Sequence, residues 1–503
     1  MSGSFVMKAL RGVLVLVLLV AAWCAVLWWL IAPDFAALSL PELGAIHVGP
    51  PLLVWGGGRF WLHRRQQGKE AAAARQEQLA ERERQATLEN VRLAYAAEQQ
   101  RLQFGCDCRA LALVQLTNTS GKPELQMPEN GAIHFSTLGP DETPVGDSLL
   151  DHLHPGVEEA LDALYARCPG AAVFPIYVVP PPDVVGEEVV ARVRAARSRF
   201  VANDSESFRF GSAMLESANA VYFLPQCESV ADSVIGLFET NVELPGAVVL
   251  AFDSPWWREQ HALDDSNDDT RDEHHQQLGM PGQGVVAVLV THPRLADMLV
   301  QTPRQGTIQD PMTPYWEKSG TRNTTSVYLS HLTDAGQDSL LRCEPLARIH
   351  RAAIATVTTL PAKRLVLSEA IETLIERAQI LSGQVDLASS DVAEDTDATK
   401  VAVPKPVSAS NCDWLVHNAG GYAFAGHRLA SLGNALFRRK LDIDPIGAAT
   451  NVIVSAGDLG QAGQVAMLAT TVAQAANCAG SALCAEFGGN DLLSVFFAAA
   501  SKG

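Results

Sequence analysis

The chain has 503 residues, of which 48% are hydrophobic and 19% charged, and its net charge is −18. This length allows one large domain or two to three ordinary ones, and the acidic charge argues against nucleic-acid binding, which needs a basic surface. Nine irregularly spaced cysteines without a CxxC pair are too few for a disulfide scaffold and favour a reducing compartment. We expect no metal site and no cofactor.

The first predicted element is a membrane anchor over residues 1–65. Residues 12–32 carry no charge and are long enough for a helix to span a bilayer, and they are too long and too rich in Trp for the core of a signal peptide. A second apolar stretch is interrupted by Pro50, Pro51 and three glycines. We predict two spans, at about 12–32 and 38–60.

Positive charges flank these spans and are missing between them. Lys8 and Arg11 precede the first span, and Arg59, Arg64 and Arg65 follow the second. The positive-inside rule then places both ends in the cytoplasm. We therefore expect a bacterial inner-membrane protein whose body faces the cytoplasm; the alternative is a single span with a periplasmic body.

A helical stalk is predicted over residues 66–104. This segment is rich in Ala, Glu, Gln and Arg, and it has no Pro and no Gly after Gly68. Intrinsic helix propensity favours one long helix with a thin apolar stripe. We interpret the helix as a stalk that holds the body away from the membrane.

The body, residues 105–503, alternates short apolar runs with helical patterns, which predicts a layered α/β fold. We divide it into halves at about 105–300 and 320–503. Residues 258–284 are acidic and polar, and residues 382–411 are rich in Ser, Asp, Thr and Pro, so both are expected to be mobile loops.

Three positions follow predicted strands and could carry chemistry. Cys227 lies at a strand-to-helix transition in LPQCESVADSVIGLFETN, where a helix dipole favours a thiolate. His417 follows the strand pattern WLVHNAGGY. In NVIVSAGDLGQAG, an apolar strand pattern ends in a glycine turn that presents Asp458 before a buried helix.

The order of these motifs resembles the β-ketoacyl synthase superfamily, the thiolase-like condensing enzymes. The matching positions are Cys227, Asp253, the glycine-led strand 284–289, the loop 417–420 and the turn 457–463. The resemblance covers roughly residues 110–500. It implies a thiolase-like, layered α/β/α body with a nucleophilic cysteine at a helix start.

The departures from that pattern predict a lost active site. Asp458 stands where the superfamily has a second histidine, and an ionised carboxylate cannot donate a hydrogen bond to a developing oxyanion. Pro225 and Gln226 replace the usual Thr-Ala before the cysteine. We therefore expect no catalytic residue. Cys227 is interpreted as a small buried residue, His417 as a buried, hydrogen-bonded histidine, and Asp458 as a helix N-cap.

A closer resemblance concerns HNAGGYAFAGHRLASLGNALFRRKLDIDP, residues 417–445. Together with the anchor and the degenerate body, it is similar to a bacterial family that includes an adaptor for a type VI secretion phospholipase effector. The resemblance implies a non-enzymatic adaptor or chaperone that binds a lipase effector and hands it to the secretion spike, the valine-glycine repeat protein. Trp256 and Trp257 are possible partner-binding anchors.

Two other functions stay open. The first is an acyl-thioester condensing enzyme that uses Cys227 as its nucleophile and His417 as its general base. The second is an envelope structural protein with a periplasmic body. The chain has no GxSxG motif, which argues against a lipase that uses this nucleophile elbow.

Overall fold

The computed structural model describes residues 3–31, 40–116, 131–139, 147–204, 206–208, 221–261, 279–302, 328–357, 364–385, 412–420, 422–488 and 491–501. The chain divides into two compact units, Met1–Glu98 and Gln99–Gly503.

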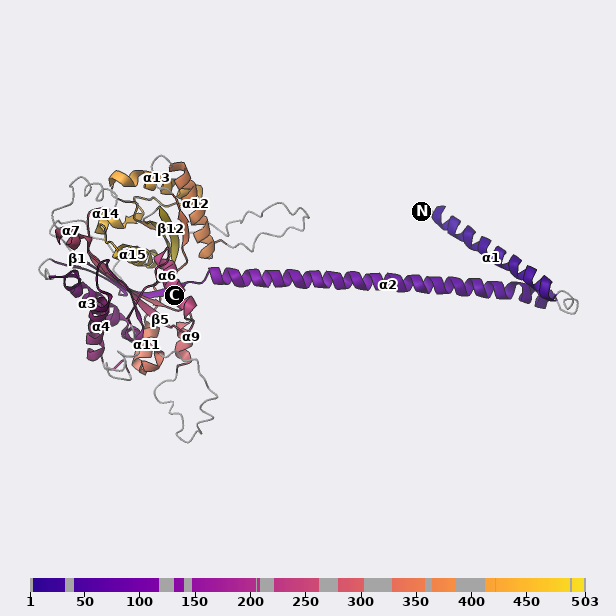
Figure 1. Ribbon diagram of the computed structural model, residues 1–503, viewed down its shortest axis with the longest axis horizontal. Coiled ribbons are helices and arrows are strands. Elements are labelled where there is room, and N and C mark those ends of the chain that lie inside the picture. Colours follow the sequence, from indigo (N-terminus) through magenta and orange to yellow (C-terminus); the bar gives the residue numbers. More distant parts are fainter. Residues whose placement is uncertain are drawn as a thin grey trace, which may run out of the picture. The chain divides into compact units, whose positions relative to one another are not determined.

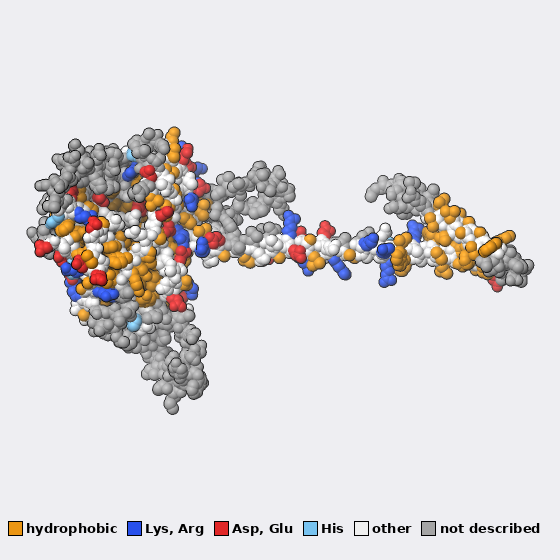
Figure 2. Space-filling model, viewed as in Figure 1, with side chains coloured by type: hydrophobic (Ala, Val, Ile, Leu, Met, Phe, Trp, Pro, Cys, Tyr) orange, Lys and Arg blue, Asp and Glu red, His pale blue; other side chains and the backbone are white. Residues whose placement is uncertain are grey.

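The first unit contains helix α1 (Gly3–Ile31) and most of helix α2 (Leu40–Leu102). Among the described residues, only Gly12–Trp29 is long and apolar enough to cross a membrane, a criterion that a signal sequence also meets. Figure 2 shows the hydrophobic side chains of this segment in orange. The second predicted span, 38–60, is therefore wrong: its three prolines, five glycines, His47 and Arg59 lower its mean hydropathy. It forms the start of α2, which continues as one helix through the predicted stalk.

Helix α2 contains Pro50 and Pro51. Proline has no amide hydrogen, so Pro50 cannot bond the carbonyl of Ile46 one turn earlier. The Trp23 indole Nε1 of α1 donates to that carbonyl at 2.8 Å. A second indole, Trp55 of α2, donates to the Gly12 carbonyl of α1 at 3.1 Å. The Trp23 bond supplies the donor that Pro50 lacks, and both bonds hold α1 against the start of α2.

The second unit, the body, is built on one mixed sheet with the strand order β10-β9-β11-β12-β7-β1-β6-β5-β3-β4; β2 pairs with β1, and β8 with β12. The strands are β1 (Cys106–Leu116), β2 (Ile133–Leu138), β3 (Ile176–Val179), β4 (Val221–Phe223), β5 (Gly246–Asp253), β6 (Gly284–Thr291), β7 (Ala347–Ile349), β8 (Ala353–Thr356), β9 (Trp414–His417), β10 (Ala449–Asn451), β11 (Ser481–Phe487) and β12 (Leu492–Ala500). We call β1–β6 the N-terminal half and β7–β12 the C-terminal half. The antiparallel pair β1–β7 joins them.

The helices of the body are α3 (Leu149–Arg167), α4 (Gly186–Asn203), α6 (Val230–Thr240), α7 (Pro255–His261), α9 (Leu295–Val300), α11 (Asp334–Arg342), α12 (Arg364–Leu381), α13 (Tyr422–Arg438), α14 (Val452–Ala456) and α15 (Ala462–Cys478), with short 3-10 helices at Pro169–Val173 and Leu329–His331. Their burial defines the layers. Strands β1, β5, β6 and β11 are buried along their whole lengths, so both faces of the sheet must be covered.

Three apolar clusters show what covers those faces. The first packs α6 and α15 between strands of both halves. The second packs α3 and α4 on the other face of β1, β5 and β6. The third packs α12 and α13 on the other face of β9, β11 and β12. The body therefore has five layers, α/β/α/β/α, with α6 and α15 in the middle (Figure 1). The predicted α/β class is confirmed, and the three layers expected become five.

Two local predictions need correction. The apolar run NVIVSAG was expected to be a strand, but β10 ends at Asn451 and Val452–Ala456 form α14. The reason is the Asn451 side chain, which accepts from the Val454 amide and caps a helix at this point. The predicted loop 258–284 begins inside α7 and ends where β6 starts, and its residues 262–278 lie outside the described residues. Most of the predicted loop 382–411 lies outside them as well.

Candidate functional site

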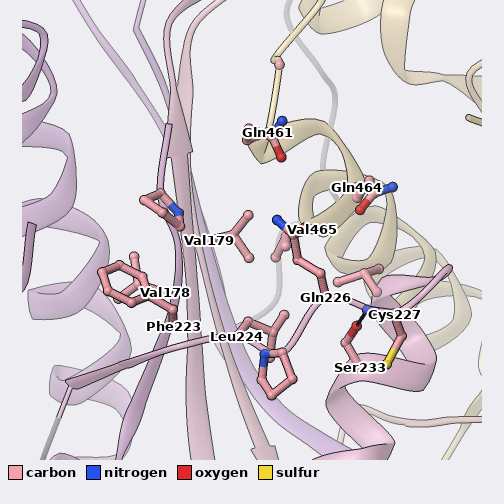
Figure 3. Close-up of a pocket in the computed structure, with 14 residues that line it drawn as sticks. Val178, Val179, Phe223, Leu224, Gln226, Cys227, Ser233, Gln461, Gln464 and Val465 are labelled. Carbon is pink, nitrogen blue, oxygen red and sulfur yellow. Dashed lines mark hydrogen bonds between the residues drawn. The ribbon is translucent and has the colours of Figure 1, made fainter. Parts of the chain in front are cut away.

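The body contains a cavity of about 640 Å³ between its two halves. Its wall comes from the ends of β3 and β4, the loop before α6, the first turns of α6, and the turn and first residues of α15 (Figure 3). The two helices of the middle layer thus both begin at this cavity. Of the three vestigial candidates, Cys227 lines it, whereas His417 and Asp458 are not part of the wall.

Cys227 lies in the loop between β4 and α6. The helix begins at Val230 with Ser229 as its N-cap, so the cysteine precedes the first turn and is exposed to solvent. The Cys227 amide donates to Ser233 Oγ at 3.1 Å. The predicted position at a strand-to-helix transition is confirmed. The expectation of a buried cysteine is wrong.

The N-terminus of α6 is capped within its own segment. Ser229 Oγ accepts from the Ala231 amide at 3.2 Å, and Asp232 stands in the first turn. Ser233 Oγ donates to the Ser229 carbonyl at 3.0 Å while it accepts from Cys227. The donors that a helix start could offer to a bound anion are thus already partly satisfied.

The N-terminus of α15 is capped by a residue from the other half. The Gln461 amide donates to Asp253 Oδ2 at 2.8 Å, and Asp253 is 1% exposed at the end of β5. Asp253 also accepts from the Ser254 amide and pairs with Arg258 of α7. Burial raises the pKa of Asp253, although these hydrogen bonds and Arg258 oppose the shift.

Asp458 was predicted to be the cap of this helix, and the structure corrects that prediction. Its Oδ1 accepts from the Gly460 amide at 2.9 Å, within the turn before α15 begins at Ala462. Its backbone bridges to Met280 and Gly282 of the segment before β6. Asp458 therefore shapes the glycine turn, while Asp253 caps the helix.

His417 ends β9 and is 2% exposed. Its Nδ1 accepts from the Ala419 amide at 3.3 Å, and its Nε2 lies 3.3 Å from the Pro445 carbonyl. This pattern requires a neutral ring with its hydrogen on Nε2, because a carbonyl only accepts. Burial lowers the pKa of His417 to about 4. Both ring nitrogens are engaged with backbone, so neither is presented to the thiol of Cys227.

Three side-chain amide groups line the cavity, and they were not among the predicted site residues. Gln226 comes from the loop before α6, and Gln461 and Gln464 come from the start of α15 (Figure 3). Gln464 is hydrogen-bonded to Glu486, a buried residue of β11 that also accepts from Ser494 Oγ at 3.2 Å. Burial raises the pKa of Glu486. The spacing of Gln461 and Gln464, three residues apart after a glycine turn, was a visible signal that they share a helix face.

The two tryptophans proposed as partner anchors lie on α7 and are half-buried. Trp257 packs against the apolar cluster beneath α3 and stacks on His261, with ring centroids 3.9 Å apart. Trp256 lies 5.9 Å from the ring of His152. These contacts favour packing over partner binding. Among the described residues, no group of three or more His, Cys, Asp or Glu side chains is arranged to hold a metal ion.

No protein-family model and no curated protein matches the chain. A ketosynthase domain from Streptomyces albus JA3453 is 12% identical, with a TM-score of 0.38 over 79% of this chain and 96% of that chain. The 3-oxoacyl-[acyl-carrier-protein] synthase III of Aquifex aeolicus VF5 is 10% identical, with a TM-score of 0.39 over 78% and 100%. Human mitochondrial 3-ketoacyl-CoA thiolase is 10% identical, with a TM-score of 0.40 over 80% and 100%. Likeness at this level carries no argument about activity, so the chemistry is argued from this chain's own residues.

Proposed function

We propose that this chain is a membrane-anchored, non-enzymatic adaptor whose thiolase-like body binds a partner protein. The observation that carries the proposal is the isolation of Cys227: this exposed residue lines a cavity, but no described side chain in the cavity wall is a histidine, lysine or carboxylate. A cavity with a thiol and without a general base is suited to binding rather than to acyl transfer.

Condensation also needs hydrogen-bond donors aimed at a developing oxyanion. The two helix starts at the cavity are the obvious sources of such donors. Ser229 caps one of them and Asp253 caps the other. His417 bonds backbone through both ring nitrogens. The groups that a condensing enzyme would use are thus engaged in holding the fold.

The identity of the partner comes from the resemblance of residues 417–445 to the type VI secretion adaptor family. It indicates a phospholipase-type effector as the cargo and the valine-glycine repeat spike protein as the recipient. The apolar segment Gly12–Trp29 supports attachment to the bacterial inner membrane. The body would then face the cytoplasm, where a newly made effector is available.

The test is capture by the full-length chain in detergent micelles. We expect a tagged chain to retain a phospholipase-type effector from the same cell and the spike protein, and the Cys227→Ser variant to retain both equally. Failure to bind either protein, with the chain shown to be folded by circular dichroism, would remove the adaptor function.

The exposed thiol favours one alternative, an acyl-thioester condensing enzyme that uses Cys227. Incubation with an acyl thioester followed by intact-mass measurement separates the two. A single stoichiometric acyl adduct on Cys227, absent from Cys227→Ser, would support the enzyme. An unmodified chain would support the adaptor.

A further inference from the structure

We propose that the cavity beside Cys227 binds an uncharged, amide-bearing chain, namely an extended peptide segment of a partner protein. This inference rests on the proposed adaptor function and deepens it, because it gives the chemistry of the partner at one site.

The first observation is the lining of the cavity. None of the described residues that line it is charged, and their polar side chains include the carboxamides of Gln226, Gln461 and Gln464 (Figure 3). A carboxamide both donates and accepts hydrogen bonds, as a peptide group does. Valines from β3, α6 and α15 supply apolar wall between these amides. Such a mixture suits a main chain with small side chains.

The second observation is that the site disfavours anions. Two helices begin at the cavity, and helix starts ordinarily attract negative charge. Here the carboxylate of Asp253 bonds the Gln461 amide, and Asp232 stands in the first turn of α6. These carboxylates lie outside the described cavity wall, but their negative charge offsets the positive ends of the two helices, so a phosphate or carboxylate ligand gains little from them. A neutral ligand loses nothing by this arrangement.

The third observation concerns the orientation of Gln464. Its side-chain amide is hydrogen-bonded to the buried Glu486, and a carboxylate only accepts hydrogen bonds. The NH2 group of Gln464 therefore faces Glu486, which leaves its carbonyl oxygen for the cavity. Glu486 is itself held by Ser494. Gln464 thus presents an acceptor suited to the N–H of a peptide group.

Selective alkylation of Cys227 in the full-length chain tests this chemistry. The three reagents are iodoacetamide, which carries an amide; methyl iodoacetate, which is neutral but has no N–H; and iodoacetate, which is an anion. In each case the thiolate attacks the methylene carbon and iodide leaves. Rates at Cys227 are followed by peptide mapping and divided by the rates of a small neutral thiol. We expect the corrected rate for iodoacetamide to exceed that for methyl iodoacetate by about fivefold, the effect of one net hydrogen bond, and iodoacetate to be the slowest.

The variants identify the responsible group. Gln464→Met should remove most of the preference for iodoacetamide without slowing methyl iodoacetate. Glu486→Gln, of equal size, should weaken the preference because it no longer fixes the amide. Gln301→Met, at an exposed position after α9, is the matched control and should change nothing. Equal corrected rates for the amide and the ester, or a Gln464→Met variant that behaves like the parent, would overturn the proposal.

A competition experiment separates this inference from the adaptor function. Short overlapping peptides that cover the captured effector are added before iodoacetamide. Protection of Cys227 by one peptide, lost in Gln464→Met, supports the site. If the effector binds the chain and no peptide protects Cys227, the adaptor function stands and the peptide site is wrong. If the effector does not bind at all but the reagent preference is present, the cavity chemistry stands and the adaptor function is wrong.

Discussion

The capping of α15 gives a sharp prediction, because sequence and structure assign it to different acids. Asp253 is 1% exposed, pairs with Arg258, and accepts from the Gln461 and Ser254 amides. Replacing it with alanine leaves Arg258 and two backbone donors without that partner. Removing one member of a buried ion pair costs about 3–5 kcal/mol, and the partial exposure of Arg258 places Asp253→Ala near the lower value, about 3 kcal/mol. Asp458 is partly exposed and bonds the Gly460 amide, so Asp458→Ala should cost about 1 kcal/mol.

The assay is urea unfolding of the full-length chain in micelles, followed by tryptophan fluorescence and circular dichroism. The Asp253→Asn variant keeps the oxygen acceptor and loses the charge, so its midpoint should fall between those of the parent and Asp253→Ala. Equal slopes among the variants would show that midpoints can be compared as stabilities. A larger loss for Asp458→Ala than for Asp253→Ala would refute the assignment of the cap.

Three further outcomes are expected. The pKa of His417 in the fold is about 4, below its ordinary 6.5, so the folded state binds fewer protons than the unfolded state, and the free energy of unfolding should fall by up to about 3 kcal/mol as the pH drops from 6.5 towards 4. In unfolding curves measured across this pH range, His417→Gln should reduce the dependence of stability on pH, and an unchanged dependence would contradict this assignment. Gly460 has φ +55°, and a methyl group there would clash with the Asp253 carboxylate, so Gly460→Ala should lower the free energy of unfolding by about 2 kcal/mol or more. Gly463→Ala is the control: an added methyl group there would meet only Leu459 at 4.0 Å, so this variant should be neutral or stabilising. Cys227→Ser should change stability by less than about 0.5 kcal/mol in the same unfolding assay, because the thiol is exposed; a larger loss would show a structural role.

The α/β class of the body was readable from the sequence because its physical cause is local. The runs that became β5 and β6 are short and apolar, and each begins with a glycine, as expected for strands covered on both faces. Periodicity could not show that α6 and α15 share one middle layer, since that depends on contacts between segments distant in the chain. The apolar runs within the stretch 38–60 also suggested a second span, but glycine, proline, His47 and Arg59 lower its mean hydropathy.

The candidate site was predicted only in part. The glycine turn and the thiol were found, but the cap of α15 was assigned to the nearest acid in sequence. The acid that performs it, Asp253, lies 208 residues away from Gln461. A local rule also failed at Asn451, where one side-chain cap turned a β-branched run into a helix. Capping rules identify the residue types that can accept from the amides at a helix start. Which of these residues lies close to a given helix start depends on the tertiary fold.

The distance between Asp253 and the helix that it caps bears on the order in which the body is made. During synthesis β5 and α7 leave the ribosome long before α15, and N-terminal segments ordinarily begin to fold first. Asp253 and Arg258 can pair at that stage, whereas the bond to Gln461 must wait for the last part of the chain. A nascent chain halted before residue 462 would hold the acceptor without its helix, and the cluster around α6 would lack the apolar surface that α15 later provides. The middle layer can thus close only after α15 has left the ribosome.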